Sequence, residues 1–519
     1  MKNNILIHKE KIVIFFIFLF SLLINQYYGN KGIFPIDSFA HFDTGYKILL
    51  GEHPFKDYWA VSGPVIDYFQ AIFFYFFGIN WQSYIFHASI FNFILSLSTY
   101  LVLREFKLDL YYSFFYTIFF SILAYPSSGT PFPDHHSAFF SLLAIYCLIL
   151  GIKNEKNWHW IMLPILLVFS FLSKQVPATY VIISVFLVLV IFSTLKNKYY
   201  WFKYSFLSFF LLISFILIFG KIVGINLSSF LEQYFFYPQS IGSERIKDLV
   251  FTFRGIFGNF KFIYIALLPL FFINLKKIIL EKKYYKDNFF YYFLVIILFT
   301  FSLIWHQVLT KNQTFIFFLI PILFAFSHIY FNLLKIKKSK FFYLFLISVC
   351  FFATIKYHIR FNENRKFHEL NSVDFELSAK ANEIDRKFLG LKWITPDYKI
   401  NSNTEIELVK DIKFHLKNDD RKIMLLTNYS FFSAILDKKI YSPSRWYPSD
   451  GSAYPLKDNK FYNSYKNLII NLIKKNNIEV IYTVLPIRNS TIYTYLDRNC
   501  VSETRISDLL NSYELKDCY

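Results

Sequence analysis

The sequence has few cysteines, no internal repeat and no low-complexity linker. Only four cysteines occur among its 519 residues. Two of them, Cys147 and Cys350, lie inside apolar runs, where a free thiol behaves as a small hydrophobic side chain.

Transporters commonly contain paired repeats and broken helices whose polar groups lie near the bilayer midplane. The sequence shows neither paired repeats nor broken helices, and its acidic residues cluster at one face of the membrane, which disfavours a transporter.

A cleavage site is also missing after the first apolar run. Three lysines precede this run, as they would in a secretory signal peptide. The run ends in the polar segment 25–28 and is not followed by a small-x-small motif. We therefore expect an uncleaved first membrane helix with a cytoplasmic N-terminus.

Apolar residues are abundant and gather in long runs. They make up 55% of the chain. Many runs approach the roughly 20 residues that a helix needs to cross the hydrocarbon. Backbone polar groups in lipid must be satisfied within the segment, so each run is expected to be a helix. The expected spans lie near residues 11–28, 84–103, 111–125, 136–152, 158–172, 176–194, 205–224, 260–275, 289–307, 314–334 and 341–357.

The chain is strongly basic, with a formal net charge of +19. Nucleic-acid binding is one explanation of such a charge. Here the basic residues lie mostly in short loops between apolar runs, at 104–107, 153–156, 196–203, 276–286 and 335–340. Membrane helices are oriented by this bias, with the basic loops in the cytoplasm. The sequence therefore predicts a multi-pass membrane protein and no nucleic-acid partner.

The topology depends on the apolar segment 64–78. This segment contains Asp67 and Gln70 and is short for a bilayer crossing. We expect it to lie at the outer interface or to dip into it. If it crossed the membrane, every later loop would change sides and the lysine bias would be reversed.

The composition becomes polar and charged after Lys356. Segments 422–427 and 479–485 are expected strands, and 464–475 is an expected amphipathic helix. The predicted fold class is a polytopic α-helical membrane protein of about eleven transmembrane helices with a C-terminal extracytoplasmic (periplasmic) α/β domain. The membrane module is expected over residues 1–360, with an outer first loop at 29–83, and the soluble domain over 361–519.

The other two cysteines, Cys500 and Cys518, fall in the expected soluble domain. Disulfides persist in oxidising compartments. If the domain lies outside the cytoplasm, these cysteines can form a disulfide that closes a loop of about 18 residues.

The first outer loop contains a helix signal and several carboxylates. Pro35 precedes Asp37 and Ser38, either of which can cap a helix that ends near Gly51. Its apolar face on the outer surface would consist of Phe39, Phe42, Tyr46 and Leu49. Asp37 is most simply a helix cap. However, carboxylates just above a bilayer are costly unless they stay solvated, pair, bind cations or take part in proton chemistry.

The second and third outer turns carry further polar residues. Asp134 stands at the start of a helix, again a capping position, and is followed by His135 and His136. Adjacent helical residues point in different directions, so the two histidines are poor joint metal ligands. Either histidine could instead contact a substrate or serve as an interfacial polar group. Lys174 either extends to the interface or contacts a phosphate.

These outer turns together resemble the GT-C class of membrane glycosyltransferases. The likeness is greatest to the bacterial family (39/83-like) related to lipid A aminoarabinose transferase and protein O-mannosyltransferase. Three features carry it: Asp37 just after the first helix, the run GEHPFKDYWAVSGPVIDYFQAIFFYFFG, and the helix pair LPILLVFSFLSKQVPATYVIISVFLVLVI with Lys-Gln at its turn. The resemblance covers residues 1–200 well and the remainder only by layout.

The resemblance implies transfer of a hexosyl or pentosyl group from a polyprenyl-phosphate donor to an extracytoplasmic lipid, glycan or protein acceptor. Asp37 is then the catalytic carboxylate that deprotonates or positions the acceptor hydroxyl, with Asp134 as a second acidic residue. These two would hold a divalent cation if one takes part. The expected substrate-binding residues are Asp57, His135, Lys174 and Arg254.

Two positions depart from the family pattern. Ser38 follows Asp37, where many relatives have two adjacent acidic residues. Ser62 precedes Gly63-Pro64, where many relatives have a basic residue that can meet the donor phosphate. The phosphate would then need another partner, and the candidates are Lys56, Lys174, Arg245 and Arg254.

Two other functions remain open. A transporter or flippase of lipid-linked saccharide would handle the same lipid without forming a glycosidic bond. A polymerase or ligase of surface polysaccharide would also join sugars outside the cytoplasm, but the first-loop match argues against that architecture.

Overall fold

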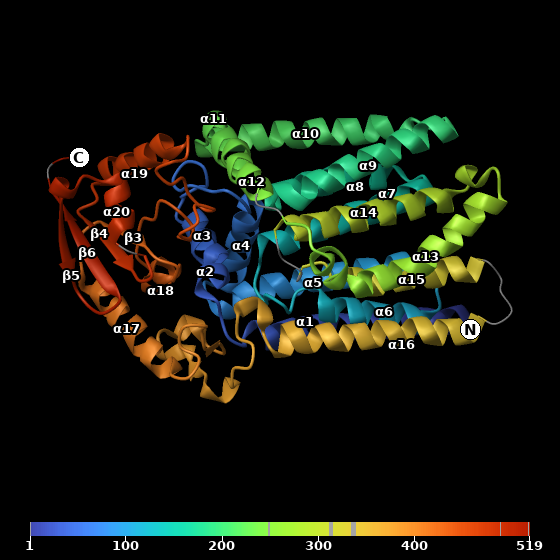
Figure 1. Ribbon diagram of the computed structural model, residues 1–519, viewed down its shortest axis with the longest axis horizontal. Helices are drawn as coiled ribbons and strands as arrows, with labels where there is room; N and C mark the ends of the chain where they lie inside the picture. The colour runs from blue at the N-terminus through green and yellow to red at the C-terminus, as the bar shows by residue number, and fades with distance from the viewer. Residues whose placement is uncertain are drawn as a thin grey trace.

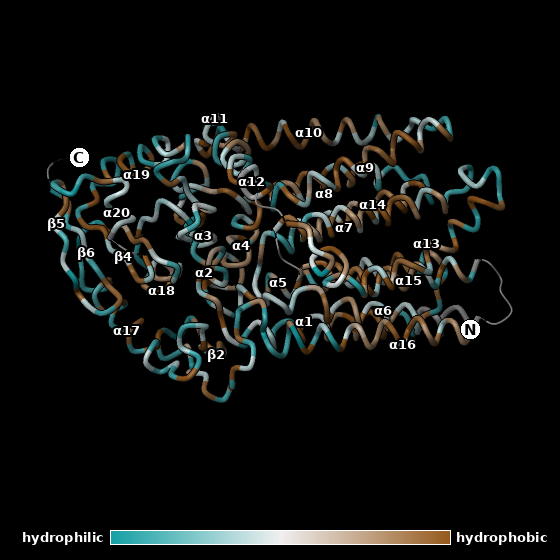
Figure 2. The backbone as a smooth tube through the Cα atoms, in the orientation of Figure 1, coloured by the Kyte–Doolittle hydropathy of each residue, from teal (hydrophilic) through white to brown (hydrophobic). Residues whose placement is uncertain are grey.

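The computed structural model describes residues 2–247, 250–310, 315–333, 339–487, 489–516 and 518. It consists of a long helical bundle with a mixed α/β part at one end (Figure 1). The N-terminus lies at the far end of the bundle, away from the C-terminal part. The bundle is mainly apolar, whereas hydrophilic and hydrophobic segments are mixed in the C-terminal part (Figure 2).

Each predicted span lies on one helix of the bundle. The helices are α1 (Lys2–Gly29), α5 (Trp81–Glu105), α6 (Leu110–Leu123), α7 (Pro133–Asn154), α8 (Asn157–Ser173), α9 (Gln175–Lys196), α10 (Tyr200–Val223), α13 (Lys261–Leu280), α14 (Asn288–Leu309), α15 (Leu319–Leu333) and α16 (Ser339–Tyr357). Within the described ranges, eight helices are long and apolar enough to cross a membrane. The helices α6, α8 and α15 are shorter, so eleven crossings stay a prediction.

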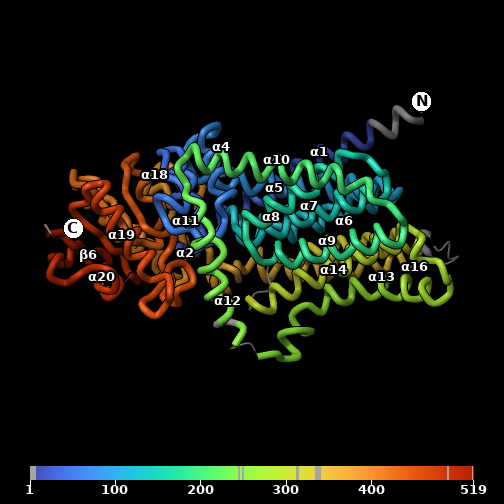
Figure 3. Tube along the Cα trace, turned by 90° about the horizontal axis from the view of Figure 1, so that it is seen from above, coloured from blue at the N-terminus to red at the C-terminus, as the bar shows by residue number. Residues whose placement is uncertain are grey.

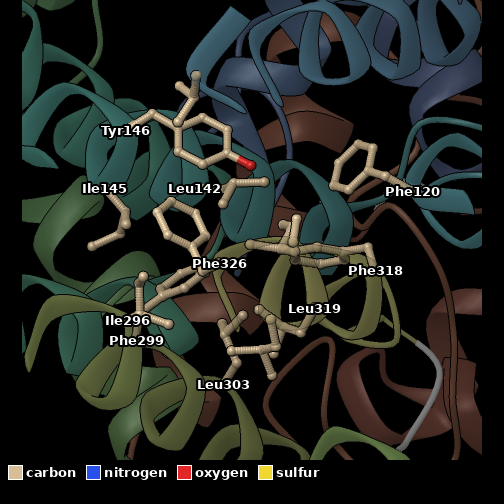
Figure 4. Close-up of a cluster of buried hydrophobic side chains, with 14 of the residues drawn as sticks. Phe120, Leu142, Ile145, Tyr146, Ile296, Phe299, Leu303, Phe318, Leu319 and Phe326 are labelled. Carbon is tan, nitrogen blue, oxygen red and sulfur yellow. The ribbon is translucent and has the colours of Figure 1, made fainter. Parts of the chain in front are cut away.

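Aromatic and aliphatic side chains fill the interior of the bundle. In Figure 4, Phe120 of α6, Leu142 of α7 and Phe318 converge with Phe299 and Leu303 of α14. All five are at most 2% exposed. Phe120 and Phe139 each contact Phe318 edge to face. Helix α10 lies at the edge of the bundle, and Ser208 is its one buried residue, as expected of a lipid-facing helix.

The basic loops meet at the N-terminal end of the bundle. Arg104 pairs with Glu10 of α1 at 2.8 Å. Lys153 pairs with Glu105 at 2.7 Å, which joins the last turn of α7 to the end of α5. Residues 334–338, which contain part of the predicted basic loop 335–340, lie outside the described residues. The described basic loops thus gather at the end opposite the C-terminal part.

The first outer loop folds into short helices at the other end. They are α2 (Pro35–Ser38), α3 (Ala40–Leu49) and α4 (Pro64–Phe77). The predicted helix end is confirmed, because Leu50 caps α3 and Gly51 follows with a φ of +78°. The capping prediction for Asp37 and Ser38 is wrong. Pro35 starts a helical turn two residues earlier, and α3 begins after Phe39 without a side-chain cap.

The predicted position of this helix on the outer surface is also wrong. Phe39 and Phe42 of α3 are fully buried. Phe39 packs against Trp81 and also against Phe388 and Trp393 of the C-terminal part. The apolar face is covered by residues from far along the chain. Helix α3 therefore lies inside the junction between the helical bundle and the C-terminal part.

Helix α4 has 14 residues and is too short to rank among the candidate spans. It exposes an apolar surface formed by Ile72, Tyr75, Phe76 and Phe77. A short helix with one apolar exposed face suits a position at a membrane interface. This geometry agrees with the expectation for segment 64–78.

A helical crossing segment follows α10 and runs over the junction (Figures 1 and 3). It consists of α11 (Leu227–Leu231), the π-helical turn η1 (Glu232–Phe236), α12 (Tyr237–Lys247) and the π-helical turn η2 (Arg254–Gly258). Tyr237 packs edge to face on Trp59 of the first outer loop and on Phe461 of the C-terminal part. The segment therefore joins three regions of the protein.

The C-terminal part contains a four-stranded sheet in the order β3-β4-β6-β5. Its elements are α17 (Ser402–Asn418), β3 (Ile423–Leu426), α18 (Phe432–Leu436), α19 (Tyr462–Asn476), β4 (Val480–Val484), α20 (Asn489–Tyr495), β5 (Val501–Arg505) and β6 (Leu510–Leu515). Strands β3 and β4 are parallel, and the other pairs are antiparallel. The two strands and the helix predicted from the sequence are confirmed as β3, β4 and α19.

Smaller elements connect the bundle to this sheet. They are η4 (His358–Glu363), η5 (Lys366–His368), η6 (Phe375–Leu377), β1 (Ala379–Lys380), η7 (Ala381–Glu383), η8 (Arg386–Phe388) and β2 (Lys392–Trp393). Two further short turns lie elsewhere: η3 (Tyr284–Lys286) between α13 and α14, and η9 (Arg498–Cys500) before β5. A disulfide joins Cys500 and Cys518, whose Cα atoms are 5.6 Å apart. It links the start of β5 to the segment after β6. Cys147 and Cys350 are free and buried, as expected of packing residues.

Candidate functional site

The carboxylate of Asp37 lies at the junction without a protein partner. Asp37 belongs to α2, where its backbone N–H donates to the carbonyl of Phe34 at 2.9 Å. Within the part of the chain that the structure describes, no hydrogen bond or ion pair reaches its side chain, which is partly accessible to solvent. A carboxylate in this state is free to interact with a ligand.

Asp134 lies in the first turn of α7 and is 4% exposed. One of its oxygens accepts a hydrogen bond from the ammonium group of Lys174 at 2.6 Å. The other lies 3.4 Å from Nε2 of His306, near the end of α14. Asp134 is therefore a paired carboxylate in a cluster built from three helix ends, and it does not cap α7.

The electrostatic surroundings of Asp37 connect it to this cluster. Burial raises the pKa of Asp37 to about 7. The carboxylate of Asp134 adds to the rise, and the ammonium group of Lys174 opposes it. Glu369, which follows η5, raises the pKa further. The predicted residues Asp37, Asp134 and Lys174 thus share one site, which we call the acidic cluster together with His306.

Residue Gln175 fixes the turn that carries Lys174. Its amide nitrogen donates to the carbonyl of Val61 at 2.8 Å and to that of Tyr234 at 2.6 Å. In addition, the N–H of Gly63 donates to the carbonyl of Ser173 at 2.8 Å. These bonds explain in physical terms why Lys and Gln stand together at this turn: one carries charge, and the other holds the backbone.

Arg365, which sequence reasoning missed, holds the turn before Asp134. Its guanidinium group is fully buried and donates to the carbonyls of Pro126 and Ser128, the latter at 3.1 Å. Its Nε donates to the carbonyl of Lys31 at 2.9 Å. One side chain after the last bundle helix therefore ties the first outer loop to the second outer turn. No local motif marks it, because its partners are backbone atoms.

A second buried carboxylate, Asp67 of α4, joins the first outer loop to the C-terminal part. His41 Nδ1 lies 2.7 Å from one oxygen, and Thr44 donates to the same oxygen at 2.5 Å. Tyr58 donates to the other oxygen at 3.1 Å, and Arg445 pairs with it. Asp67 and Arg445 are at most 3% exposed. The sequence showed Asp67 only as a polar residue in an apolar segment.

The remaining predicted residues lie apart from the acidic cluster. Asp57 accepts a hydrogen bond from the N–H of His53 at 2.9 Å and pairs with Lys475 at 3.3 Å. Arg254 is exposed in η2, and its charge acts on Lys366. Neither is among the charges that act on Asp37.

His135 is fully buried beside the acidic cluster. Its ring nitrogens lie 3.2 Å from the hydroxyl of Ser127 and 3.1 Å from that of Ser128. Its ring packs on Phe139 and Phe315. A substrate contact by His135 stays a prediction, and its present partners belong to the second outer turn.

Of the other phosphate candidates, Lys56 donates to the carbonyl of Val223 at 2.9 Å. This places it at the end of α10 and not at the acidic cluster. The side chain of Arg245 lies outside the described residues. Lys174 is therefore the candidate cation that the structure places beside Asp37 and Asp134.

An apolar groove of about 600 Å³ lies between η2, α13 and α14. Its walls consist of Ile256, Phe257, Tyr264, Leu267, Leu268, Phe271, Phe301, Ile304, Trp305 and Val308. Trp305 precedes His306 directly along α14, so the groove extends to the helix end that carries a member of the acidic cluster. An apolar chain fits such walls.

The residues present do not form a ready cation site. Over the described ranges, no group of three or more histidine, cysteine or carboxylate side chains could hold a metal ion. Asp37 and Asp134 provide two carboxylates, and the second is already paired with Lys174.

The described part of the chain is thus a multi-helix bundle of the kind found in multi-pass membrane proteins, with a charged cluster at one end and an apolar groove beside it. Residues 53–219 match the family model for dolichyl-phosphate-mannose-protein mannosyltransferase. This match supports the resemblance, found in the sequence, to membrane glycosyltransferases of the GT-C class. The matched segment contains Asp134 and Lys174, and Asp37 precedes it.

Similarity to other known proteins is remote. The crystal structure of ArnT from Cupriavidus metallidurans in the apo state is similar over 99% of this chain and 98% of that chain, with 10% sequence identity and a TM-score of 0.46. No curated protein matches the chain.

Proposed function

We propose that the protein transfers a hexosyl or pentosyl group from a polyprenyl-phosphate donor to an acceptor outside the cytoplasm. The observation that carries this proposal is the unpartnered carboxylate of Asp37, whose pKa is raised to about 7, next to the Asp134–Lys174 pair. A carboxylate with a pKa near the working pH is suited to accept a proton.

Asp37 acts as the general base in this proposal. The acceptor hydroxyl attacks the anomeric carbon of the sugar, and its proton passes to the Asp37 carboxylate. The bond between the anomeric carbon and the phosphate oxygen breaks, and polyprenyl phosphate leaves with the electron pair. One glycosidic bond replaces one glycosyl-phosphate bond, so the step balances without a redox partner.

Lys174 stabilises the departing phosphate. Within the acidic cluster, the positive charge comes from the ammonium group of Lys174, which pairs with Asp134. An ammonium group is a suitable point charge for a phosphate. Asp134 pairs with the lysine, and the hydrogen bonds of Gln175 fix the turn that carries it. Preorganised charge at the position where negative charge develops is a large contribution to catalysis.

The apolar groove at α13 and α14 receives the prenyl chain. Its volume of about 600 Å³ and its aromatic and aliphatic walls suit an isoprenoid. The groove extends toward His306, so a lipid lying in it would direct its phosphate to the acidic cluster. This arrangement supports a lipid-linked donor over a soluble nucleotide sugar.

The site faces the extracytoplasmic side in this proposal. The described basic loops lie at the opposite end of the bundle, and such loops favour the cytoplasm. The expected compartment of the C-terminal part also permits the Cys500–Cys518 disulfide.

The test replaces Asp37 by Asn in the full chain reconstituted in liposomes. The substrates are a panel of undecaprenyl-phosphate hexoses and pentoses with radiolabelled sugars, together with membrane lipids and glycans as acceptors. We expect Asp37→Asn to abolish transfer while expression and membrane insertion are unchanged.

The matched control is Asp109→Asn. Asp109 caps α6 at the opposite end of the bundle, and Asn caps a helix about as well as Asp. Full transfer activity in Asp37→Asn would refute the assigned role. Movement of labelled lipid between leaflets without a glycosidic product would instead support the flippase alternative.

A further inference from the structure

A polar cavity of about 300 Å³ lies between the first outer loop, the crossing segment and α19. It is separate from the acidic cluster and from the apolar groove. Its lining residues are Phe55, Lys56, Trp59, Gly224, Asn226, Ser229, Glu232, Gln233, Ser464, Asn467, Leu468, Asn471, Leu472 and Lys475. We propose that this cavity binds a sugar residue of a glycan-bearing acceptor.

Helix α19 presents one polar face to the cavity. Ser464, Asn467, Asn471 and Lys475 recur at intervals of three or four residues and so lie along one side of the helix. The opposite side is apolar and packs into the C-terminal core. The amide groups of Asn467 and Asn471 make no hydrogen bond to any described residue, and both residues are exposed.

Amide side chains are well suited to sugar hydroxyls. A hydroxyl both donates and accepts a hydrogen bond, and an amide offers both a donor and an acceptor at neutral charge. Two amides one helical turn apart can meet hydroxyls on neighbouring carbons of a sugar ring. A free polar row of this kind distinguishes the cavity from a packing defect.

Trp59 contributes an unsatisfied donor at the wall of the cavity. Trp59 is 2% exposed and is held edge to face between Tyr237 and Tyr465. Its indole N–H has no hydrogen-bond partner among the described residues. Buried donors without a partner are uncommon, because desolvation without a hydrogen bond is costly. A sugar hydroxyl in the cavity would satisfy this donor.

The charges around the cavity balance. Lys56 lies 3.8 Å and Lys475 lies 3.3 Å from the carboxylate of Asp57, so one acid serves both lysines. Glu232 adds a second negative charge to the lining, and no described cation pairs with it. Two positive and two negative groups favour a neutral, hydroxyl-rich ligand over a phosphate. Asp57, predicted from the sequence as a substrate contact, thus acts by holding the lysines of this cavity.

A short segment connects the cavity to the acidic cluster. The N–H of Ala60, next to Trp59, donates to the side chain of Gln233 at 3.0 Å. Val61 accepts from Gln175, which directly follows Lys174. A sugar bound against Trp59 would therefore lie beside the segment 59–61, and this segment contacts the turn that carries Lys174. This position suits a unit of the acceptor remote from the reacting hydroxyl.

The inference rests on the proposed function only in treating the bound sugar as part of an acceptor. Binding itself can be measured without transfer. The full chain in detergent is mixed with methyl glycosides of common hexoses and N-acetylhexosamines, and binding is followed by saturation-transfer difference NMR. Inorganic pyrophosphate serves as the anionic probe.

Two variants test the cavity. In Asn467→Ala/Asn471→Ala the amides are lost, and Ala favours the helix more than Asn does. In Trp59→Phe the indole donor is lost, and the aromatic packing is largely kept. We expect saccharide binding to weaken about tenfold in each variant, as for the loss of one or two hydrogen bonds. In transfer assays we expect KM for a glycan acceptor to rise while kcat is unchanged.

The matched control is Asn463→Ala, since Asn463 is exposed on α19 but does not line the cavity. Asp37→Asn should bind saccharide normally, so failure of the proposed transfer and failure of this inference give different results. Absence of saccharide binding to the unaltered chain would overturn the inference, as would equal binding in the control and the double variant. Competition by pyrophosphate would also overturn it, in favour of an anion site.

Discussion

At the scale of single residues, the partners of three aspartates decide their roles. Asp67 is fully buried and is satisfied by four side chains. Asp134 is buried and paired with Lys174. Asp37 has no partner among the described residues and has a raised pKa. Only the third arrangement leaves a carboxylate able to exchange a proton, because the other two are committed to cations.

The raised pKa of Asp37 predicts a pH dependence of transfer. A general base must be ionised, so kcat/KM should rise with pH and level off above the pKa of about 7. The profile is measured in liposomes between about pH 5 and 9. A rate independent of pH over this range would contradict the role of Asp37.

The same pKa shift predicts the sign of a stability change. The folded protein holds the Asp37 proton more tightly than the unfolded chain, whose pKa is near 3.8. The associated stability is therefore present at low pH and is lost as pH rises through about 7. Asp37→Asn should raise Tm above this pH, and differential scanning fluorimetry in detergent can measure the change. An unchanged or lower Tm would show that the carboxylate is better solvated than its surroundings indicate.

Replacement of Lys174 tests the phosphate contact. Lys174→Met removes the charge and should lower kcat by about 10²–10³-fold, the range found for loss of one preorganised transition-state contact. Lys174→Arg keeps the charge and should recover part of the rate. Equal loss in both variants would indicate a purely structural role through Asp134. Lys221→Met, at the end of the edge helix α10, is the control.

The sequence could predict those site residues that lie in local motifs. Asp37, Asp134 and Lys174 stand at helix ends in a recognisable order, and the structure brings them together. His306 and Arg365 also serve the site, but they come from distant helix ends, and nothing in their local sequence distinguishes them from other polar residues at a helix end. Their contribution depends on tertiary packing, which local sequence does not encode.

At the scale of elements, the first outer loop shows where pattern reasoning succeeds and where it fails. Helical spacing and Gly51 correctly predicted α3 and its end. The same apolar face was assigned to the outer surface because its covering partners, Phe388, Trp393 and Phe431, lie more than 300 residues later. Amphipathicity shows that a face is buried, but it does not show against what.

The pair Asp67–Arg445 predicts a strong link between the loop and the C-terminal part. Arg445→Met would leave the Asp67 carboxylate buried without its cation and should cost about 3–5 kcal/mol of stability. The free energy of unfolding is followed by denaturant titration in detergent. The double variant Asp67→Asn/Arg445→Met should recover part of the loss, because no buried charge remains.

The control for this pair is Arg505→Met. Arg505 pairs with Asp508 at 2.9 Å, but both side chains are at least 70% exposed. Exposed ion pairs contribute about 0–1 kcal/mol, so little change is expected. Similar losses in Arg445→Met and Arg505→Met would show that the buried pair is not a special link.

At the scale of the whole molecule, the apolar runs and the lysine bias were sufficient to place the bundle helices. They could not show how the C-terminal part meets the bundle. The structure seats it on the first outer loop through Phe39, Asp57 and Asp67, all of which contact residues beyond 380. The early aspartates and the C-terminal part therefore lie at the same end of the molecule, and the described basic loops lie at the other (Figure 1).

This arrangement predicts the result of surface labelling. Lys457→Cys lies in the C-terminal part, and Lys107→Cys lies in a basic loop at the opposite end. Background labelling should be low, because the native cysteines are buried or joined in a disulfide. On intact cells, a membrane-impermeant maleimide should modify Lys457→Cys alone, and permeabilised cells should allow modification of both. Modification of Lys107→Cys on intact cells would reverse the orientation of every helix and place the acidic cluster in the cytoplasm, where an extracytoplasmic acceptor cannot reach it.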